Sequence, residues 1–358
     1  PLKNPTQLIA ARLGSPLVIG VDSGNYYVAS DAIPIAKYTR NIVLLDDGDL
    51  VVMTHDSILL KKDDDSSQLP NVTTVDWDIE NTALGNFSHY MLKEIYEQPN
   101  SIQDTCRGRI NDVHDFVTLG GLYNVLPRLV EAKRIIIVAC GTSWHAGLLG
   151  EYFLEDIARI PVEVEYASEF RYRNPIITPD DVVLAISQSG ETADTLAAIR
   201  LAKERGALVL GICNVVGSSI ARETQAGVYT HAGPEIGVAS TKAFTAQVTV
   251  LAMLALLLGY SRNKLTDKEY HNSIRALLET PKKIHEILER SDVVKYIAER
   301  FYQVTNFLYL GRGYFFPVAL EGALKLKEIS YIHAEGYAAA EMKHGPIALI
   351  DENMPVVV

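Results

Sequence analysis

The sequence predicts an α/β protein in which a β-rich N-terminal segment precedes two modules with parallel sheets. Three observations support this prediction: hairpin-linked apolar runs before about residue 60, alternating strand-like and helix-like runs from about residue 121, and a second copy of that alternation near the C-terminus. Short β-branched runs separated by helices need crossover connections. Such connections give parallel strands that are covered by helices on both faces.

Composition limits the classes of function. The chain has 358 residues, of which 48% are hydrophobic and 22% charged, and a formal net charge of −11. The length predicts two or three domains. The acidic balance argues against a nucleic-acid surface, because phosphate-backbone affinity needs clustered Lys and Arg. The longest apolar run, 248–258, has the length of a core helix, and no leader pattern opens the chain, so a cytoplasmic protein without a membrane span is expected.

The three cysteines, Cys106, Cys140 and Cys213, show no C-x-x-C spacing. Cys140 and Cys213 each end an apolar run. We therefore expect buried, reduced thiols and no disulfide framework.

The first 60 residues are predicted to form antiparallel strands. Gly24-Asn25 and the run 46–49 have the residues of hairpin turns. The polar run 61–70 then predicts a domain boundary, so residues 1–65 form the first domain and 66–120 a linker with a helix over 86–97 that Pro99 ends. The expected strands are 17–21, 26–30, 42–45, 50–54 and 57–60.

Residues 121–262 are predicted to form the first α/β module, followed by a helical segment over 263–295. Its expected strands are 134–140, 162–166, 182–187, 208–213 and 228–230, and its expected helices lie near 144–158, 192–205 and 241–258.

An internal repeat predicts a second module over 296–358. The run from Gly141 to Ile157 lines up with the run from Gly313 to Ile329, and an apolar strand precedes each run. By this register the second copy stops in the strand that corresponds to 182–187. We therefore expect an incomplete second module and a chain that is a fragment at both ends.

The segment from Ser187 to Thr192 is predicted to hold a phosphate group. A buried strand leads into hydroxyl residues and Gly190, and a helix follows, whose free N–H groups and positive dipole end attract anions. The alternative is a serine-rich turn in which Ser189 caps the helix.

An ionisable triplet distinguishes the second copy from the first. Glu321, Lys325 and Glu328 are spaced to share one helix face. A solvated Glu–Lys pair is the plainer explanation. The helix is otherwise rich in Ala, Leu and Ile, however, and it follows the carboxyl edge of a strand, where α/β proteins bind ligands. A carboxylate beside a lysine there suits proton abstraction next to a carbonyl. The first copy has Leu149, Phe153 and Asp156 at the corresponding positions.

His344 precedes Gly345-Pro346, which favours turn backbone and an exposed imidazole. Glu341 and His344 have the spacing of a metal-ligand pair, but no second pair supports a metal site. Gly311-x-Gly313 begins a dinucleotide fingerprint, yet Phe316 stands where the third glycine belongs. We therefore expect no metal and no nicotinamide cofactor.

Four segments together resemble the glutamine:fructose-6-phosphate aminotransferase (isomerising) family, and the resemblance covers essentially the whole chain. The segments are Cys140–Ser143, Ser187–Thr192, Gly237–Lys242 and Ala319–Ser330. The runs 11–20 and 29–31 are similar to the closing half of that family's glutaminase domain. The resemblance implies two tandem sugar isomerase (SIS) modules, the second truncated, after the end of a glutaminase domain.

The resemblance also implies site residues. Glu328 matches the base that moves a proton between C1 and C2, and Lys325 and Glu321 match its neighbours in the acidic pocket. His344 matches a ring-opening histidine that the other subunit of a homodimer contributes, and Asp31 matches the carboxylate that binds the glutamine amino group. The residues that match the sugar-phosphate site are Thr142, Ser143, Ser187, Gln188, Ser189, Thr192, Val238 and Ser240.

The implied activity is the conversion of fructose 6-phosphate and glutamine into glucosamine 6-phosphate and glutamate, without a cofactor. The family's N-terminal cysteine nucleophile would precede Pro1, and its Schiff-base lysine would follow Val358, so this fragment is expected to be incomplete for activity. Two alternatives are a phosphosugar isomerase without amidotransfer and a sugar-phosphate sensor without catalysis. The acidic, β-rich N-terminus offers no basic recognition helix for a DNA-binding sensor.

Overall fold

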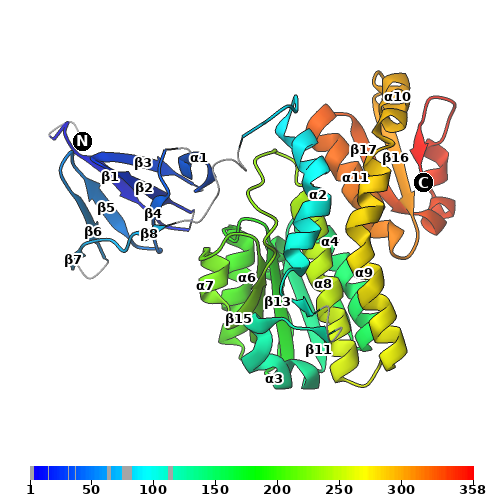
Figure 1. Ribbon diagram of the computed structural model, residues 1–358, viewed down its shortest axis with the longest axis horizontal. Helices are drawn as coiled ribbons and strands as arrows, with labels where there is room; N and C mark the ends of the chain where they lie inside the picture. Colours follow the sequence, from blue (N-terminus) through cyan, green and yellow to red (C-terminus); the bar gives the residue numbers. More distant parts are fainter. Residues whose placement is uncertain are drawn as a thin grey trace. The chain divides into compact units, whose positions relative to one another are not determined.

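The computed structural model describes residues 4–14, 16–30, 32–36, 38–62, 66–74, 83–111 and 116–358 (Figure 1). The chain divides into two compact units, Pro1–Gly85 and Asn86–Val358. The second unit contains both α/β modules.

The N-terminal unit consists of two four-stranded antiparallel sheets, with strand orders β1-β5-β6-β7 and β3-β2-β4-β8. The five predicted strands are confirmed as β2 to β6. The sequence did not predict the mostly exposed β1 or the two-residue strands β7 and β8. Because β7 pairs with β6 and β8 with β4, this unit continues beyond residue 65. Its elements are β1 (Leu8–Ala11), β2 (Val18–Asp22), β3 (Asn25–Ala29), α1 (Ile33–Ala36), β4 (Asn41–Leu44), β5 (Leu50–Met53), β6 (Ile58–Lys61), β7 (Ser67–Gln68) and β8 (Thr73–Thr74).

The linker helix α2 (Tyr90–Cys106) continues through Pro99, so the prediction that Pro99 ends it is wrong. A proline inside a helix has no N–H for the carbonyl four residues earlier. That carbonyl belongs to Ile95, and it accepts a hydrogen bond from Gln98 Nε2 at 3.0 Å. The Gln98 side chain thus supplies a donor where Pro99 has none. The helix α2 packs along α8 (Lys242–Ser261) and α9 (Asp267–Leu288) (Figure 1).

The first module is built on a five-stranded parallel sheet with strand order β12-β11-β13-β14-β15, which confirms the predicted strands and their direction. Side chains of a strand alternate between the two faces. In β13, Leu184 and Ile186 belong to the core cluster that includes α8, whereas Val183 and Ala185 belong to the cluster that includes α6. Helices therefore cover both faces of the sheet.

The elements up to the end of this sheet are β9 (Ile110–Asn111), β10 (Phe116–Val117), a 3-10 helix (Gly120–Val125), α3 (Leu126–Glu131), β11 (Arg134–Ala139), α4 (Thr142–Phe153), a π-helical turn (Leu154–Ala158), β12 (Val162–Tyr166), α5 (Ala167–Phe170), β13 (Asp181–Ser187), α6 (Ala193–Glu204), β14 (Leu208–Cys213), α7 (Ser219–Glu223) and β15 (Ala226–Tyr229).

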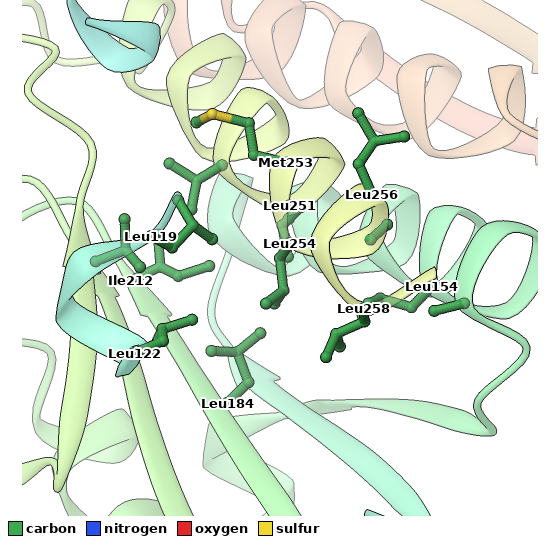
Figure 2. Packing of buried hydrophobic residues seen from close by; sticks show 14 of the residues in the cluster. Leu119, Leu122, Leu154, Leu184, Ile212, Leu251, Met253, Leu254, Leu256 and Leu258 are labelled. Carbon is green, nitrogen blue, oxygen red and sulfur yellow. The ribbon is translucent and has the colours of Figure 1, made fainter. Parts of the chain in front are cut away.

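The helix α8 (Lys242–Ser261) forms the centre of the larger core cluster. Figure 2 shows its Leu251, Leu254 and Leu258 on the side of the sheet that carries Leu184 and Ile212. By length and composition α8 could cross a membrane, but 67% of its most apolar window is buried inside the protein. This burial agrees with the core helix expected from the apolar run.

The second module repeats the start of the first. Its three-stranded parallel sheet has the order β17-β16-β18, and α11 packs on β16 and β17. β18 lies beside β16 as β13 lies beside β11. The remaining elements are α9 (Asp267–Leu288), α10 (Ser291–Phe301), β16 (Asn306–Gly311), α11 (Phe315–Ser330), β17 (His333–Ala338), two 3-10 helices (Ala339–His344 and Pro346–Leu349) and β18 (Val356–Val357).

An ion pair fastens the first residues of β11 and β13 to each other. Arg134 Nε and Nη2 each donate to a carboxylate oxygen of Asp181 at 3.0 Å. Burial alone would raise the pKa of Asp181, but the hydrogen bonds from Arg134 and Thr178 outweigh it and lower that pKa. A carboxyl with a lowered pKa stabilises the fold above its unfolded-state pKa, and this contribution is lost as the pH falls through the folded-state pKa.

We expect Arg134→Met to reduce the free energy of unfolding by about 3 kcal/mol at pH 7, because Asp181 stays buried without its partner. The difference from wild type should shrink as the pH falls below about 4, where carboxyls become protonated. Urea unfolding at pH 7 and pH 3 measures both values. Lys133→Met is the control, since its pair with Asp180 is exposed. An equal loss of stability at both pH values would contradict this account.

Candidate active site

The last residue of β13 and the loop from there to α6 carry four of the predicted sugar-phosphate residues. Ser187 Oγ lies 3.0 Å from Thr192 Oγ1 and accepts a hydrogen bond from the Gly190 N–H at 3.0 Å. Ser189 Oγ accepts from the Glu191 N–H at 3.2 Å, which is a turn contact within the loop. The helix begins at Ala193, and its N-cap residue Thr192 makes no side-chain capping bond. The alternative, in which Ser189 caps the helix, is therefore wrong, and α6 begins without a side-chain cap.

Gly190 allows this loop to turn and to lie against α7. Its φ of 68° is in the left-handed region, and a Cβ there would lie 2.0 Å from Ser218 Oγ. The Gly190 carbonyl accepts from the Ile220 N–H at 2.9 Å, and Glu191 Oε1 accepts from the Ser219 N–H at 2.8 Å. These contacts fix the loop before any ligand binds.

The turn after β11 and the start of α4 supply two further hydroxyls. Gly141, with a φ of 55°, precedes Thr142 and Ser143 at the start of α4. Ser143 Oγ accepts a hydrogen bond from Gln247 Nε2 of α8 at 3.0 Å. β11 and β13 are adjacent and parallel, so both loops leave the same edge of the sheet.

A cavity of about 230 Å³ lies at this edge. It brings together all eight predicted sugar-phosphate residues and two of the predicted acid–base residues. Its lining residues are Cys140, Thr142, Ser143, Ile186, Ser187, Gln188, Ser189, Thr192, Val238, Ser240, Lys325 and Glu328.

The ionisable triplet of α11 forms a connected cluster. Lys325 Nζ lies 2.7 Å from Glu328 Oε2 and 3.3 Å from Glu321 Oε1, and it donates to Thr142 Oγ1 at 3.0 Å. The Glu321 side chain is 8% exposed and that of Lys325 17%. The solvated pair considered as the plainer explanation is therefore wrong. Glu328, at 34% exposure, is the carboxylate of this cluster that lines the cavity.

His145 is a member of this cluster that the sequence analysis missed. Its Nδ1 lies 2.6 Å from Glu321 Oε2, and the other Glu321 oxygen accepts from Thr142 Oγ1 at 2.9 Å. The signal was available, because His145 follows Thr142 by three positions and so shares its helix face. Its partner Glu321, in the second module, could not be read from that spacing.

The corresponding face of α4 has no acid–base group in the cavity. Leu149 is buried, and Phe153 packs against the larger core cluster. Asp156 accepts a hydrogen bond from the Tyr314 hydroxyl at 3.0 Å. The two copies thus differ at these three positions, since the first copy uses them for core packing and a contact with Tyr314, whereas α11 carries the ionisable triplet there.

Cys140 lines the cavity, but it is not activated as a nucleophile. Burial raises the pKa of its thiol, which outweighs the hydrogen bonds that its sulfur accepts. At neutral pH the side chain is a thiol, and the thiolate is the reactive form.

Two predicted residues are not placed in the cavity. His344 is exposed at the end of a 3-10 helix and is not among the cavity-lining residues. Asp31 lies outside the described residues. Within the described ranges, no group of three or more His, Cys, Asp and Glu side chains could hold a metal ion.

The SIS domain family matches residues 128–257 and 300–358, which fall in the two modules. The chain belongs to the SIS domain family. This match and the two parallel sheets confirm the predicted fold class for the second unit.

Curated relatives confirm the resemblance that the sequence segments indicated. The glutamine–fructose-6-phosphate aminotransferase (isomerizing) of Chlorobaculum tepidum is 61% identical over 356 residues, and that of Bacteroides thetaiotaomicron is 56% identical over 357 residues. Each match covers 99% of this SIS-domain chain but 58% of the relative. The chain therefore spans less than two thirds of the length of these relatives.

Solved structures share the fold of the second unit. The C-terminal domain of glucosamine-fructose-6-phosphate aminotransferase from Francisella tularensis gives a TM-score of 0.74 at 43% identity and covers 76% of each chain. Tagatose-6-phosphate ketose/aldose isomerase from Escherichia coli gives a TM-score of 0.59 at 18% identity, over 75% of this chain and 72% of that one. At this lower identity the likeness shows a common SIS fold only.

We expect Gly190→Ala to destabilise the protein more than Gly313→Ala. Both positions have positive φ, but only at Gly190 does the new methyl group meet a neighbour, Ser218. Backbone strain alone costs about 1 kcal/mol, so Gly313→Ala should lose about that much free energy of unfolding and Gly190→Ala clearly more. Urea unfolding of both variants tests this. Equal losses would show that Ser218 does not restrict the loop.

Proposed function

We propose that this chain is the sugar-phosphate part of an enzyme that converts fructose 6-phosphate and glutamine into glucosamine 6-phosphate and glutamate. One observation supports this proposal most strongly. A single cavity places the hydroxyl-rich loop of the first module opposite Lys325 and Glu328 of the second, in a chain 61% identical to a protein named for this activity.

The loop from Ser187 to Thr192 is proposed to bind the phosphate. Its hydroxyls, together with those of Thr142 and Ser143, offer donors without a fixed charge. The positive end of α6 faces the same place and favours a dianion. A small phosphate held in this way is consistent with a net charge of −11, because no extended basic surface is needed.

Glu328 is proposed to be the base of the isomerisation. Ammonia condenses with the C2 carbonyl of the sugar and releases water, which leaves an imine. The imine nitrogen takes up a proton. Glu328 then takes a proton from C1, the C1–H electron pair forms a C1–C2 double bond, and the C=N electron pair moves to the nitrogen, which becomes an amine. When the proton is returned to C2 and the C1 hydroxyl loses its proton, an aldehyde forms at C1. Lys325 Nζ lies 2.7 Å from Glu328 Oε2, and its positive charge lies beside the reacting carbons together with the carboxylate.

The N-terminal unit is proposed to contain the closing part of a glutaminase domain, with Asp31 as the ligand of the glutamine amino group. In this proposal residues 1–65 belong to that domain together with the strands β7 and β8 that pair with it, and the rest of 66–120 is a linker. Residues 121–262 and 296–358 form the two SIS domains, and 263–295 form a connecting segment. The glutaminase supplies the ammonia, and no cofactor takes part.

A cytoplasmic homodimer is proposed as the working form. His344 is exposed and is not one of the residues that line the cavity. In the proposed dimer it opens the sugar ring in the cavity of the other subunit. No nucleic acid or membrane partner is proposed.

Incubation of the full-length protein with glutamine and fructose 6-phosphate tests the proposed reaction. We expect glucosamine 6-phosphate and glutamate to form in equal amounts, measured by chromatography. Isomerisation without consumption of glutamine would instead favour a plain phosphosugar isomerase. Binding without turnover of either substrate would favour a sensor.

Glu328→Gln in the full-length protein should reduce glucosamine 6-phosphate formation at least about 100-fold, because general-base catalysis contributes that much or more. Glutamine hydrolysis should stay largely intact, since the change lies in the sugar site. Glu299→Gln, on the exposed face of α10, is the matched control and should leave both rates unchanged. An equal loss of both activities in Glu328→Gln would contradict the role given to Glu328.

A further inference from the structure

Glu94 of α2 is a buried carboxylate that the proposed reaction does not use. It is 2% exposed, and its Oε1 accepts hydrogen bonds from the N–H groups of Ile236 at 2.6 Å and Gly237 at 3.0 Å. Gly237 N also lies 3.2 Å from Oε2. A carboxylate on the linker helix thus holds two successive backbone N–H groups of a loop far away in the sequence.

That loop forms one wall of the sugar-phosphate cavity. Directly after Gly237 come Val238 and Ser240, which both line the cavity. Val238 is 98% exposed, so no protein packing fixes its side chain. Its position depends on the backbone on either side.

The far end of the loop is attached to the same helix. Lys242, the first residue of α8, has a side chain that is 5% exposed, and its Nζ lies 2.8 Å from Glu97 Oε2. Glu94 and Glu97 are three positions apart and therefore share a face of α2. Within the loop, Glu235 accepts from the N–H groups of Thr241 at 2.8 Å and Ala243 at 3.1 Å. The segment from Val238 to Thr241 is thus held at both ends.

The fit between α2 and the loop is close. A Cβ on Gly237 would lie 2.5 Å from Glu94 Oε2 and 3.3 Å from the Met91 backbone. Burial raises the pKa of Glu94, and the two N–H groups offset this only in part. Burial at this place thus disfavours the charged form of the Glu94 carboxyl group. A contact that only packed the helix against the loop would not need a carboxyl group there.

We propose that Glu94 is a positioning residue of the sugar-phosphate site, which holds Val238 and Ser240 at the cavity without touching the ligand. This inference rests on the proposed function for the identity of the ligand. It makes α2, the first helix of the second unit, the support of the cavity wall. The affinity for the sugar phosphate then depends on a residue outside the cavity.

The test compares Glu94→Leu with Glu94→Gln in the full-length protein. Leucine removes every acceptor, so KM for fructose 6-phosphate should rise about tenfold while kcat changes less than about twofold, because the two N–H groups lose their partners. Glutamine keeps one oxygen acceptor for both N–H groups and should restore KM to within about threefold of wild type. An unchanged KM in Glu94→Leu would overturn the proposal, as would an equal loss in both variants.

Hydrogen exchange without any ligand provides a readout that does not depend on the proposed function. In Glu94→Leu the amides of residues 236–241 should exchange faster, while those of α6 keep wild-type rates. A uniform increase over the second unit would overturn the proposal, because it would show a general loss of stability. If wild type neither binds nor converts fructose 6-phosphate, the proposed function fails, and the local exchange result still decides whether Glu94 holds the loop.

Gly237→Ala keeps the test valid if Glu94→Leu does not fold. The added methyl group displaces the loop from the opposite side and should raise KM and local exchange in the same way. Gly120→Ala is the matched control, since a Cβ there meets nothing within 4 Å. Wild-type KM and exchange in Gly237→Ala would overturn the proposal.

Discussion

The ammonium group of Lys325 links the two modules at the cavity. Lys325 is held by two carboxylates of its own helix and by the Thr142 hydroxyl of the other module. A largely buried lysine needs such partners, because an unpaired charge there would be costly. The contact of α11 with α4 therefore sets the distance between the ionisable triplet of α11 and the hydroxyl-rich segments of the first module.

Duplication of one α/β module explains why this arrangement is possible. Both copies place a strand-to-helix turn at the carboxyl edge of a parallel sheet, which is where such sheets bind ligands. In the first copy the helix face carries Leu149 and Phe153 and completes a core. In the second copy the same positions carry Glu321 and Lys325, which makes that face available for chemistry.

Much of the fold and the site could be predicted, because short patterns in the sequence indicate them. Short apolar and β-branched runs located the strands, and residue types and spacing located the hydroxyl-rich loop and the α11 triplet. Contacts between segments that are far apart in the sequence leave no such pattern. The hydrogen bond of Gln98 that lets α2 pass Pro99, the pairing of His145 with Glu321, and the hold of Glu94 on Ile236 all depend on the tertiary structure.

The central claim is that the loop of the first module binds the phosphate while the second module faces the reacting carbons. A crystal structure with fructose 6-phosphate bound tests it most directly. The account predicts the phosphate within hydrogen-bond distance of Ser187, Ser189 and Thr192, with C1 and C2 beside Glu328. A phosphate bound against Lys325, with the sugar carbons at the Ser187 loop, would contradict it.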